Sequence, residues 1–274
     1  MREKTLTWKR LITGLGHENW QYAKKKATAG AITACSILGG LLLWQIASTQ
    51  ISPLFLPSPS ITLEGLYELA EDGTLMTSIL ASSRRILIGW LSGVIVGIPL
   101  GMIMGYFPLI RRLFDPYIEF FRFVPPIAFV TLAVIWLGPG EASKVALIFY
   151  TTVFIVTLNA LAGTLAVSEL RIKASQALGA SSMQSLVTVI VPSTIPYMIT
   201  GARIAMGNSF LTIVSAEIVA AQEGLGALIW NARNFGRTEW VFAGIFTLGL
   251  LGYVFDRVLR FIASRALKRY GISM

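Results

Sequence analysis

The sequence predicts an all-α, polytopic membrane protein with about six transmembrane helices. Of its 274 residues, 54% are hydrophobic and only 14% are charged, and the mean hydropathy is +0.68. Soluble domains carry about a quarter of charged residues, so this composition indicates a membrane protein. A bilayer core needs about 20 apolar residues per helix, a length that fits six times along the chain. The expected spans are 28–49, 84–106, 120–138, 143–167, 194–221 and 240–262.

Lysine and arginine residues predict the orientation of the spans, since they accumulate in cytoplasmic segments. Segments 1–27, 107–122 and 168–193 and the C-terminal end hold seventeen of them, whereas the segments on the opposite side hold five. The basic tail 1–27 and the end 266–274 are therefore expected in the cytoplasm. This orientation also explains the net charge of +9, because the basic residues form no stripe with interleaved aromatic residues of the kind that binds nucleic acid.

The chain lacks the residues of several enzyme and metal sites. Cys35 is the only cysteine and lies in an apolar run, where we expect it to pack; His17 is the only histidine and lies in the polar tail. One cysteine and one histidine are too few for a disulfide framework or for a thiolate or histidine metal centre, and the position of His17 in the tail argues against a histidine-based triad. No G-x-x-x-x-G-K-[ST] motif occurs, so the chain has no P-loop of its own. The first span, 28–49, shows no signal-peptide pattern and is expected to remain as an anchor.

Segment 50–83 is expected to be the largest loop on the outer side. It opens with "ISPLFLPSPS", whose prolines hold an extended path and exclude a helix. The next stretch, "ITLEGLYELAEDG", has apolar residues at helical spacing and acidic residues opposite. It predicts a short amphipathic helix at the outer surface. The alternative is a solvated loop helix with no binding role.

Segment 168–193 predicts two short helices joined at Gly179. A glycine after Leu178 suits the left-handed residue that ends a helix, and Ser181 followed by Gln184 resembles a capping box that starts the next one. Glu169 and Lys173 lie on a polar face, while Leu178 can face inward or toward a partner. Such a unit could dock in a groove of another protein, or it could be an ordinary turn between membrane helices.

Span 194–221 carries polar groups on two faces. Arg203 and Glu217 share one face but lie about 21 Å apart along the axis, so they cannot pair with each other. A second polar stripe, with i, i+4, i+7 spacing, consists of Asn208, Thr212 and Ser215. We expect one face to line a passage and the other to pack against neighbouring spans; alternatively, these groups only satisfy one another between helices. The candidate pathway residues are Arg203, Asn208, Ser209, Thr212, Ser215 and Glu217.

Pro125 and Pro126 predict a break or kink at the beginning of span 120–138, because they remove two backbone donors and disfavour helix at Val124. A kinked element there could form part of an inner gate. The alternative is a fixed start of the helix.

Several stretches resemble one transporter family. "KASQALGASSMQSLVTVIVP" resembles the EAA loop of ABC importer permeases at positions that include Ala174, Gly179 and Pro192, with departures at Lys173 and Ser175. "FFRFVPPIAFVTLAVIWLGPGEASK", "ISPLFLPSP" and "SAEIVAAQEGLG" resemble the subfamily that imports nitrate, sulfonates, taurine and bicarbonate. The resemblance covers residues 50–265. It implies the type I importer permease fold, with a core over 84–265 that includes the coupling loop 168–193.

The resemblance also implies partners and a mechanism. A dimer of permeases in the bacterial inner membrane would stand on two ATPase subunits, which bind the ATP and Mg²⁺, and a substrate-binding protein would deliver the cargo from outside. The chain itself would hold no cofactor, would contact lipid, and would move a small anion by alternating access. The residues implied in ATPase coupling are Glu169, Arg171, Lys173, Ala174, Ser175, Leu178, Gly179, Ala180 and Ser181.

Two other functions would need other residues. An ion-coupled secondary transporter usually has intramembrane carboxylates, often in matched halves, but the spans of this chain offer Glu217 and no second half. A membrane-embedded enzyme would need clustered Asp, His or Glu at the edge of a span. The sequence therefore favours the importer subunit over both.

Overall fold

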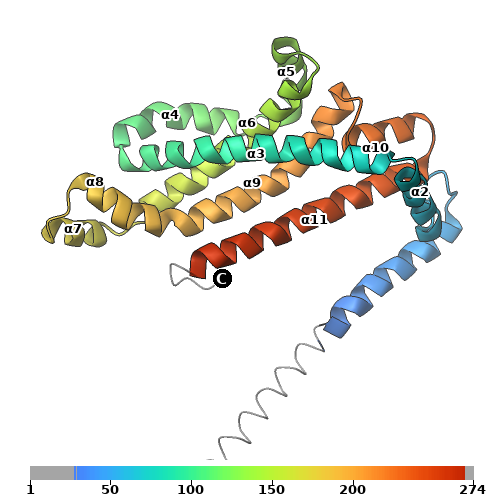
Figure 1. The fold of residues 1–274 in the computed structure, drawn as a ribbon, viewed down its shortest axis with the longest axis horizontal. Helices are drawn as coiled ribbons and strands as arrows, with labels where there is room; N and C mark the ends of the chain where they lie inside the picture. Colours follow the sequence, from blue (N-terminus) through green and yellow to red (C-terminus); the bar gives the residue numbers. More distant parts are fainter. Residues whose placement is uncertain (1–27, 29, 269–274) are drawn as a thin grey trace, which may run out of the picture. The chain divides into compact units, whose positions relative to one another are not determined.

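The computed structural model describes residues 28 and 30–268, and all regular elements in this part of the chain are helical (Figure 1). The predicted tail 1–27, with His17, and the chain after Lys268 lie outside the described residues. Five helices are long and apolar enough to cross a membrane, and a bent pair of helices adds a sixth span if the pair is counted as one. The predicted all-α membrane fold is confirmed.

The N-terminal unit, up to Thr62, contains one of these five helices, Gly30–Gln50. This helix matches the predicted first span. The Trp44 indole Nε1 donates a hydrogen bond to the Pro57 carbonyl oxygen at 3.0 Å, which ties the proline-containing segment back to the helix. Cys35 is exposed on the helix surface, so the expected packing of this side chain is not found within the described part of the chain.

The predicted amphipathic helix of segment 50–83 is present as α2 (Pro59–Glu71). Its Leu69 is buried against Leu228 and Ala243. Glu68 accepts hydrogen bonds from Trp240 Nε1 at 2.9 Å and from Arg237. Hydrogen bonds to Glu239 and Glu68 raise the pKa of the Arg237 guanidinium above its usual value, so the guanidinium keeps its charge.

Helix α3 (Thr74–Tyr106) starts ten residues before the predicted span, at Thr74 instead of residue 84. The added turns carry small polar side chains, Ser78 and Ser82, which are buried. Buried small hydroxyl groups can replace apolar residues where helices approach closely. Arg84 and Arg85, expected at the edge of a span, therefore lie inside the helix.

Helix α3 packs against α6 (Glu141–Leu165) along a row of glycines spaced four residues apart. A Cβ atom at Gly101 would lie 2.3 Å from the Thr157 carbonyl oxygen, and one at Gly93 would lie 2.6 Å from Thr152 Cβ. Only glycine permits this approach of the two backbones. Inside a membrane the hydrophobic effect does not drive helices together, so close packing at small residues holds them. The row consists of Gly89, Gly93, Gly97, Gly101 and Gly105.

The predicted span 120–138 contains the expected break, but its helical part begins earlier, at Pro108. Helix α4 (Pro108–Phe121) occupies the expected connecting segment 107–122, and after a break at Pro125 a 3-10 turn (Pro126–Phe129) leads into α5 (Val130–Leu137). The two halves meet at 90°. Pro125 has extended backbone and Pro126 begins the turn, so the chain breaks where the two prolines predict, and 108–137 is called the broken span here because the bent pair is long and apolar enough to cross a membrane once.

The remaining elements follow the predicted order. After α6 come α7 (Glu169–Ala177), α8 (Ser182–Ser185) and a π-helical turn (Leu186–Ile190), which runs into α9 (Val191–Ala220). Helix α10 (Leu225–Asn234) lies between the expected spans 194–221 and 240–262, and α11 (Thr238–Lys268) is the last helix of the described residues. The α3, α6 and α9 helices share a core of Ile86, Ile148, Met206, Phe210 and Ile213, and α11 packs against α9 (Figure 1).

Candidate functional site

The segment α7–α8, here called the elbow (residues 168–185), has the hinge that the sequence predicts. Gly179 has φ of +89°, the left-handed conformation. The Gly179 amide donates to the Gln176 carbonyl at 2.9 Å, and the Ala180 amide donates to the Ser175 carbonyl at 3.1 Å. These two bonds form a Schellman motif, which ends α7 by satisfying carbonyl groups that the helix leaves free.

The second arm of the elbow starts at the predicted capping box. The Gln184 amide donates to Ser181 Oγ at 3.2 Å, and the Ser181 amide donates to Gln184 Oε1 at 2.7 Å. In addition, the Ser175 and Ser185 hydroxyl groups are 2.7 Å apart and join the two arms. The Ser175 that departs from the EAA pattern thus makes a contact across the hinge, which an alanine could not.

The elbow presents apolar side chains to its surroundings. Leu178 is 90% exposed and Leu170 is 75% exposed. Around them lie exposed polar residues, with an ion pair between Lys173 and Glu169 at 3.2 Å. Isolated exposed leucines are common on protein surfaces, so the docking role of the elbow stays a prediction. The other predicted coupling residues, Arg171, Ala174, Ala180 and Ser181, lie on the same elbow.

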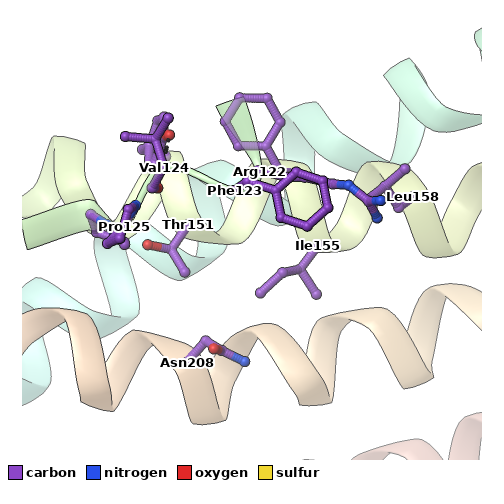
Figure 2. A pocket seen from close by; sticks show the side chains of 11 residues that line it. Arg122, Phe123, Val124, Pro125, Thr151, Ile155, Leu158 and Asn208 are labelled. Atoms are coloured by element: carbon purple, nitrogen blue, oxygen red, sulfur yellow. Dashed lines mark hydrogen bonds between the residues drawn. The ribbon is translucent and has the colours of Figure 1, made fainter. Parts of the chain in front are cut away.

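A second feature, here called the hollow, opens where the broken span meets α6 and α9. It has a volume of about 330 Å³. Figure 2 shows Arg122, Phe123 and Val124 on one side, Asn208 of α9 on the other, and Thr151 and Ile155 of α6 between them. The predicted gate residues Pro125 and Pro126 also line it. The hollow thus combines a cation and two small polar groups with apolar walls.

Tyr150 holds the break that forms one wall of the hollow. Its hydroxyl donates to the Phe121 carbonyl oxygen at 2.6 Å and lies 3.3 Å from that of Val124. Its ring packs against Phe129 and Phe154, with centroids 5.0 Å apart in each pair. Backbone groups freed by a break at membrane depth need such partners, because the hydrocarbon provides none.

The predicted pathway stripe of α9 is divided between the hollow and helix packing. Asn208 lines the hollow. The Thr212 hydroxyl lies 3.0 Å from that of Thr151, and the Ser209 hydroxyl lies 3.3 Å from that of Thr152, so both contact α6. Ser215 is half-buried on α9.

The two charged residues of α9 have separate partners, as predicted. Arg203 Nη2 lies 2.9 Å from Asp256 Oδ1 of α11, and Asp256 also pairs with Arg260. This cluster joins α9 to α11. Both Arg203 and Asp256 remain partly exposed, so it is accessible from the surface of the bundle.

Glu217 lies at the centre of a second, buried cluster, here called the clamp. Its carboxylate accepts hydrogen bonds from Arg85 Nη1 at 2.7 Å, from Ser82 Oγ at 2.8 Å and from the Gly226 amide at 2.8 Å. Arg85 also reaches Glu141 at 2.6 Å. The clamp therefore connects α3, α6, α9 and the start of α10, and Glu217 is only 1% exposed and does not line the hollow.

Sequence reasoning missed Arg85 and Arg122. Arg85 was placed at the edge of a span and Arg122 was counted in a loop, whereas Arg85 is buried inside α3 and Arg122 caps α4 within the broken span. The signal for Arg122 was its position directly before the proline break, in "FFRFVPP". Within residues 28 and 30–268, no group of three or more His, Cys, Asp or Glu side chains could hold a metal ion.

Comparisons with known proteins agree on one family. The family described as "binding-protein-dependent transport system inner membrane component" matches residues 97–268. The taurine transport system permease protein TauC of Escherichia coli K12 is 41% identical over 234 residues, which cover 83% of this chain and 85% of that protein. The nitrate import permease protein NrtB of Synechocystis sp. is 31% identical, with 82% of this chain and 84% of that protein covered.

Two further comparisons extend the pattern. The bicarbonate transport system permease protein CmpB of Synechocystis sp. is 31% identical over 238 residues, 82% of this chain and 85% of that protein. A solved structure of the MetNI methionine ABC transporter, in an inward-facing conformation, has a TM-score of 0.59 at 17% identity and covers 70% of this chain and 97% of its own. That likeness shows the fold.

Proposed function

Because this chain belongs to the binding-protein-dependent transport system inner membrane component family, we propose that it is the subunit through which a small sulfonate, taurine or a close analogue, enters the cell. It is the permease of an ABC importer and not an enzyme. The observation that supports taurine as the cargo is the 41% identity to a taurine permease, compared with 31% identity to relatives that import nitrate or bicarbonate.

The elbow is the part that we assign to the ATPase partners. Its rigid hinge and the exposed Leu170 and Leu178 suit insertion into a groove of a soluble subunit. ATP and Mg²⁺ would be bound in those partners, and nucleotide-driven closure would move the elbow and, through the π-helical turn, α9. A π-helical turn inside a helix commonly marks a functional site.

A second copy of the chain would cover the hollow. Polar side chains and broken backbone at mid-span cannot face lipid, but they can line a passage or lie against protein. Asn208 and Arg122 therefore favour a water-filled path between two permeases. Alternating access then needs the ATPase partners to stabilise inward-open and outward-open states differently.

The orientation follows from the same assignment. The elbow would lie in the cytoplasm, together with both termini, and α2 and α10 would face the periplasm, where a substrate-binding protein delivers the cargo. The excess of lysine and arginine on the elbow side supports this placement in the bacterial inner membrane.

Reconstitution tests the proposal. The chain is inserted into liposomes with the ATPase and the binding protein encoded beside it, and uptake of labelled taurine, nitrate and bicarbonate is measured. We expect ATP-dependent uptake of taurine above the two inorganic anions. Uptake by this chain alone, driven by a proton gradient, would instead indicate a secondary transporter, and ATP-driven uptake of nitrate or bicarbonate alone would overturn the sulfonate assignment.

A further inference from the structure

We propose that Arg122 binds the sulfonate group of the cargo halfway across the membrane, and that Asn208 and Thr151 accept its ammonium end. This inference rests on the proposed function and goes beyond it, since it names the residues that contact the cargo. Three observations support it: the depth of Arg122, its lack of an ion partner and the chemistry of the hollow.

The hollow lies near the middle of the bundle. At 1.5 Å per residue, Tyr150 and Thr151 lie about 14 Å from the start of α6, and Asn208 lies about 18 Å from the end of α9. Tyr150 fixes the break to the same level through the carbonyl groups of Phe121 and Val124. Arg122, between these two residues, is therefore inside a hydrocarbon core about 30 Å thick and not at its edge.

Arg122 differs from Arg85 and Arg203, the arginines that lie more than ten residues inside α3 and α9. Arg85 pairs with Glu217 and Glu141, and Arg203 pairs with Asp256. In the described part of the chain, Arg122 is an exposed residue with no ion pair, and its guanidinium lies 4.5 Å from the centroid of the Phe123 ring.

A charge at this depth is costly, and an intramembrane cation without a fixed counter-ion is by default a candidate for a pathway role. The aromatic face holds the guanidinium without neutralising it. A transported anion would supply the missing charge only while it passes. This arrangement binds the cargo weakly enough to release it.

The chemistry of the hollow fits a short zwitterion with a sulfonate at one end. A guanidinium presents a planar fork of N–H donors that matches two oxygens of an oxyanion. On the far side, the Asn208 amide already donates to the Ile204 carbonyl at 3.0 Å, which leaves its carbonyl oxygen to accept. Ile155 and Leu158 provide an apolar wall for the carbons between the two ends. The hollow can therefore orient the cargo.

A thiol-labelling experiment tests the contact without measuring transport. In the assembled transporter, Asn208→Cys is introduced on a Cys35→Ser background, which removes the one natural cysteine. The labelling rate is compared for an anionic reagent, ethylsulfonate methanethiosulfonate, and a cationic one, ethyltrimethylammonium methanethiosulfonate. If Arg122 faces the hollow, the anionic reagent is favoured, and Arg122→Gln should lower the anion-to-cation rate ratio about tenfold, since a nearby unpaired charge dominates the local field.

Uptake provides the second measurement and its control. Arg122→Gln should lower taurine uptake about tenfold or more because a charge-assisted contact is lost, and Arg122→Lys should restore part of it. Arg112→Gln, which removes an exposed arginine at the other end of α4, should leave uptake and the rate ratio within about twofold, as expected for surface charges. ATPase activity and complex yield are measured for every variant.

The outcomes separate this inference from the proposed function. An unchanged rate ratio in Arg122→Gln, or loss of uptake only in proportion to lost complex, overturns the role of Arg122 even if the wild type imports taurine. If the wild type carries nitrate instead, the sulfonate assignment fails, whereas a fall in the rate ratio would still support Arg122 as an anion contact.

Discussion

At the residue scale, the clamp around Glu217 buries an ion pair and surrounds its carboxylate with hydrogen-bond donors. The carboxylate is fully buried, and Arg85, Ser82 and the Gly226 amide all donate to it. Desolvation of two ions costs several kcal/mol, roughly what their attraction and these extra hydrogen bonds return. The net contribution to stability is therefore small while the clamp is whole and large once one member is removed.

Glu217→Ala should therefore destabilise the protein, since it leaves the Arg85 guanidinium buried with only Glu141 as a counter-ion. We expect a loss of about 3 to 5 kcal/mol, the usual cost of breaking a buried pair. Thermal unfolding in detergent measures it. Uptake per folded complex should change little, because the carboxylate is closed off from the hollow.

Glu223→Ala is the matched control. Glu223 is adjacent to the clamp, but its side chain is exposed and only its carbonyl oxygen contacts Arg85. Its unfolding temperature should match that of the wild type. A Glu217→Ala protein with normal stability and lost uptake would contradict the structural role and return Glu217 to the pathway.

At the element scale, the glycine row of α3 sets the distance to α6. Gly→Ala in a helix normally stabilises by up to about 1 kcal/mol. At Gly101 the sign should reverse, because the new Cβ would meet the Thr157 carbonyl oxygen and Ala160 at less than 3 Å. The backbones cannot rotate away from each other without opening the shared core, so we expect Gly101→Ala to cost about 1 to 3 kcal/mol, as overpacking does.

Gly249→Ala on α11 tests the same substitution in open space. A Cβ at Gly249 would meet nothing within 4 Å, so the helix propensity alone should act, and the variant should be as stable as the wild type or slightly more so. Thermal unfolding of both variants gives the comparison. Equal effects at the two positions would mean that the row of glycines does not hold α3 against α6.

The elements differ in how far the sequence determines them. The lengths of α6, α9 and α11 follow from apolar runs, and the elbow follows from Gly179 and the capping box, which are local signals. The start of α3 and the course of α4 depend on packing against distant helices, which no local pattern specifies. The i, i+4 spacing of the glycines from Gly89 to Gly105 was visible in the sequence and would have identified the α3 surface that faces a neighbour.

The candidate sites show the same division. The spacing on α9 identified a set of polar candidate residues. It did not predict that Ser209 and Thr212 would contact α6 while Asn208 lines the hollow. Arg85 and Glu217 are 132 positions apart, so their pairing depends on the tertiary fold. Charge counting assigned Arg122 to a loop because it treats every segment between apolar runs as outside the membrane, whereas this segment returns into it as α4.

At the scale of the whole molecule, α6 and α9 join the elbow to the hollow. The hinge at Gly179 has open space around it, so a side chain there meets no neighbour within the chain. The cost of substitution comes from φ of +89°, about 1 to 2 kcal/mol for a residue with a Cβ. That cost favours a different angle between α7 and α8, which would misplace the surface that we propose docks on the ATPase.

Gly179→Ala should therefore raise the number of ATP molecules hydrolysed per molecule imported about threefold or more, while the protein stays inserted. Gly179→Trp should raise this ratio further. Gly179→Asn should raise it less, because asparagine tolerates the left-handed conformation. Coupled ATPase and uptake assays on one proteoliposome preparation measure the ratio. Gly236→Ala is the control, because Gly236 has φ of +69° and open space but lies after α10, at the opposite end of the bundle. It should carry similar strain and keep the wild-type ratio. If both variants raise the ratio equally, backbone strain anywhere in the chain disturbs coupling, and the elbow loses its special role as the link to the ATPase.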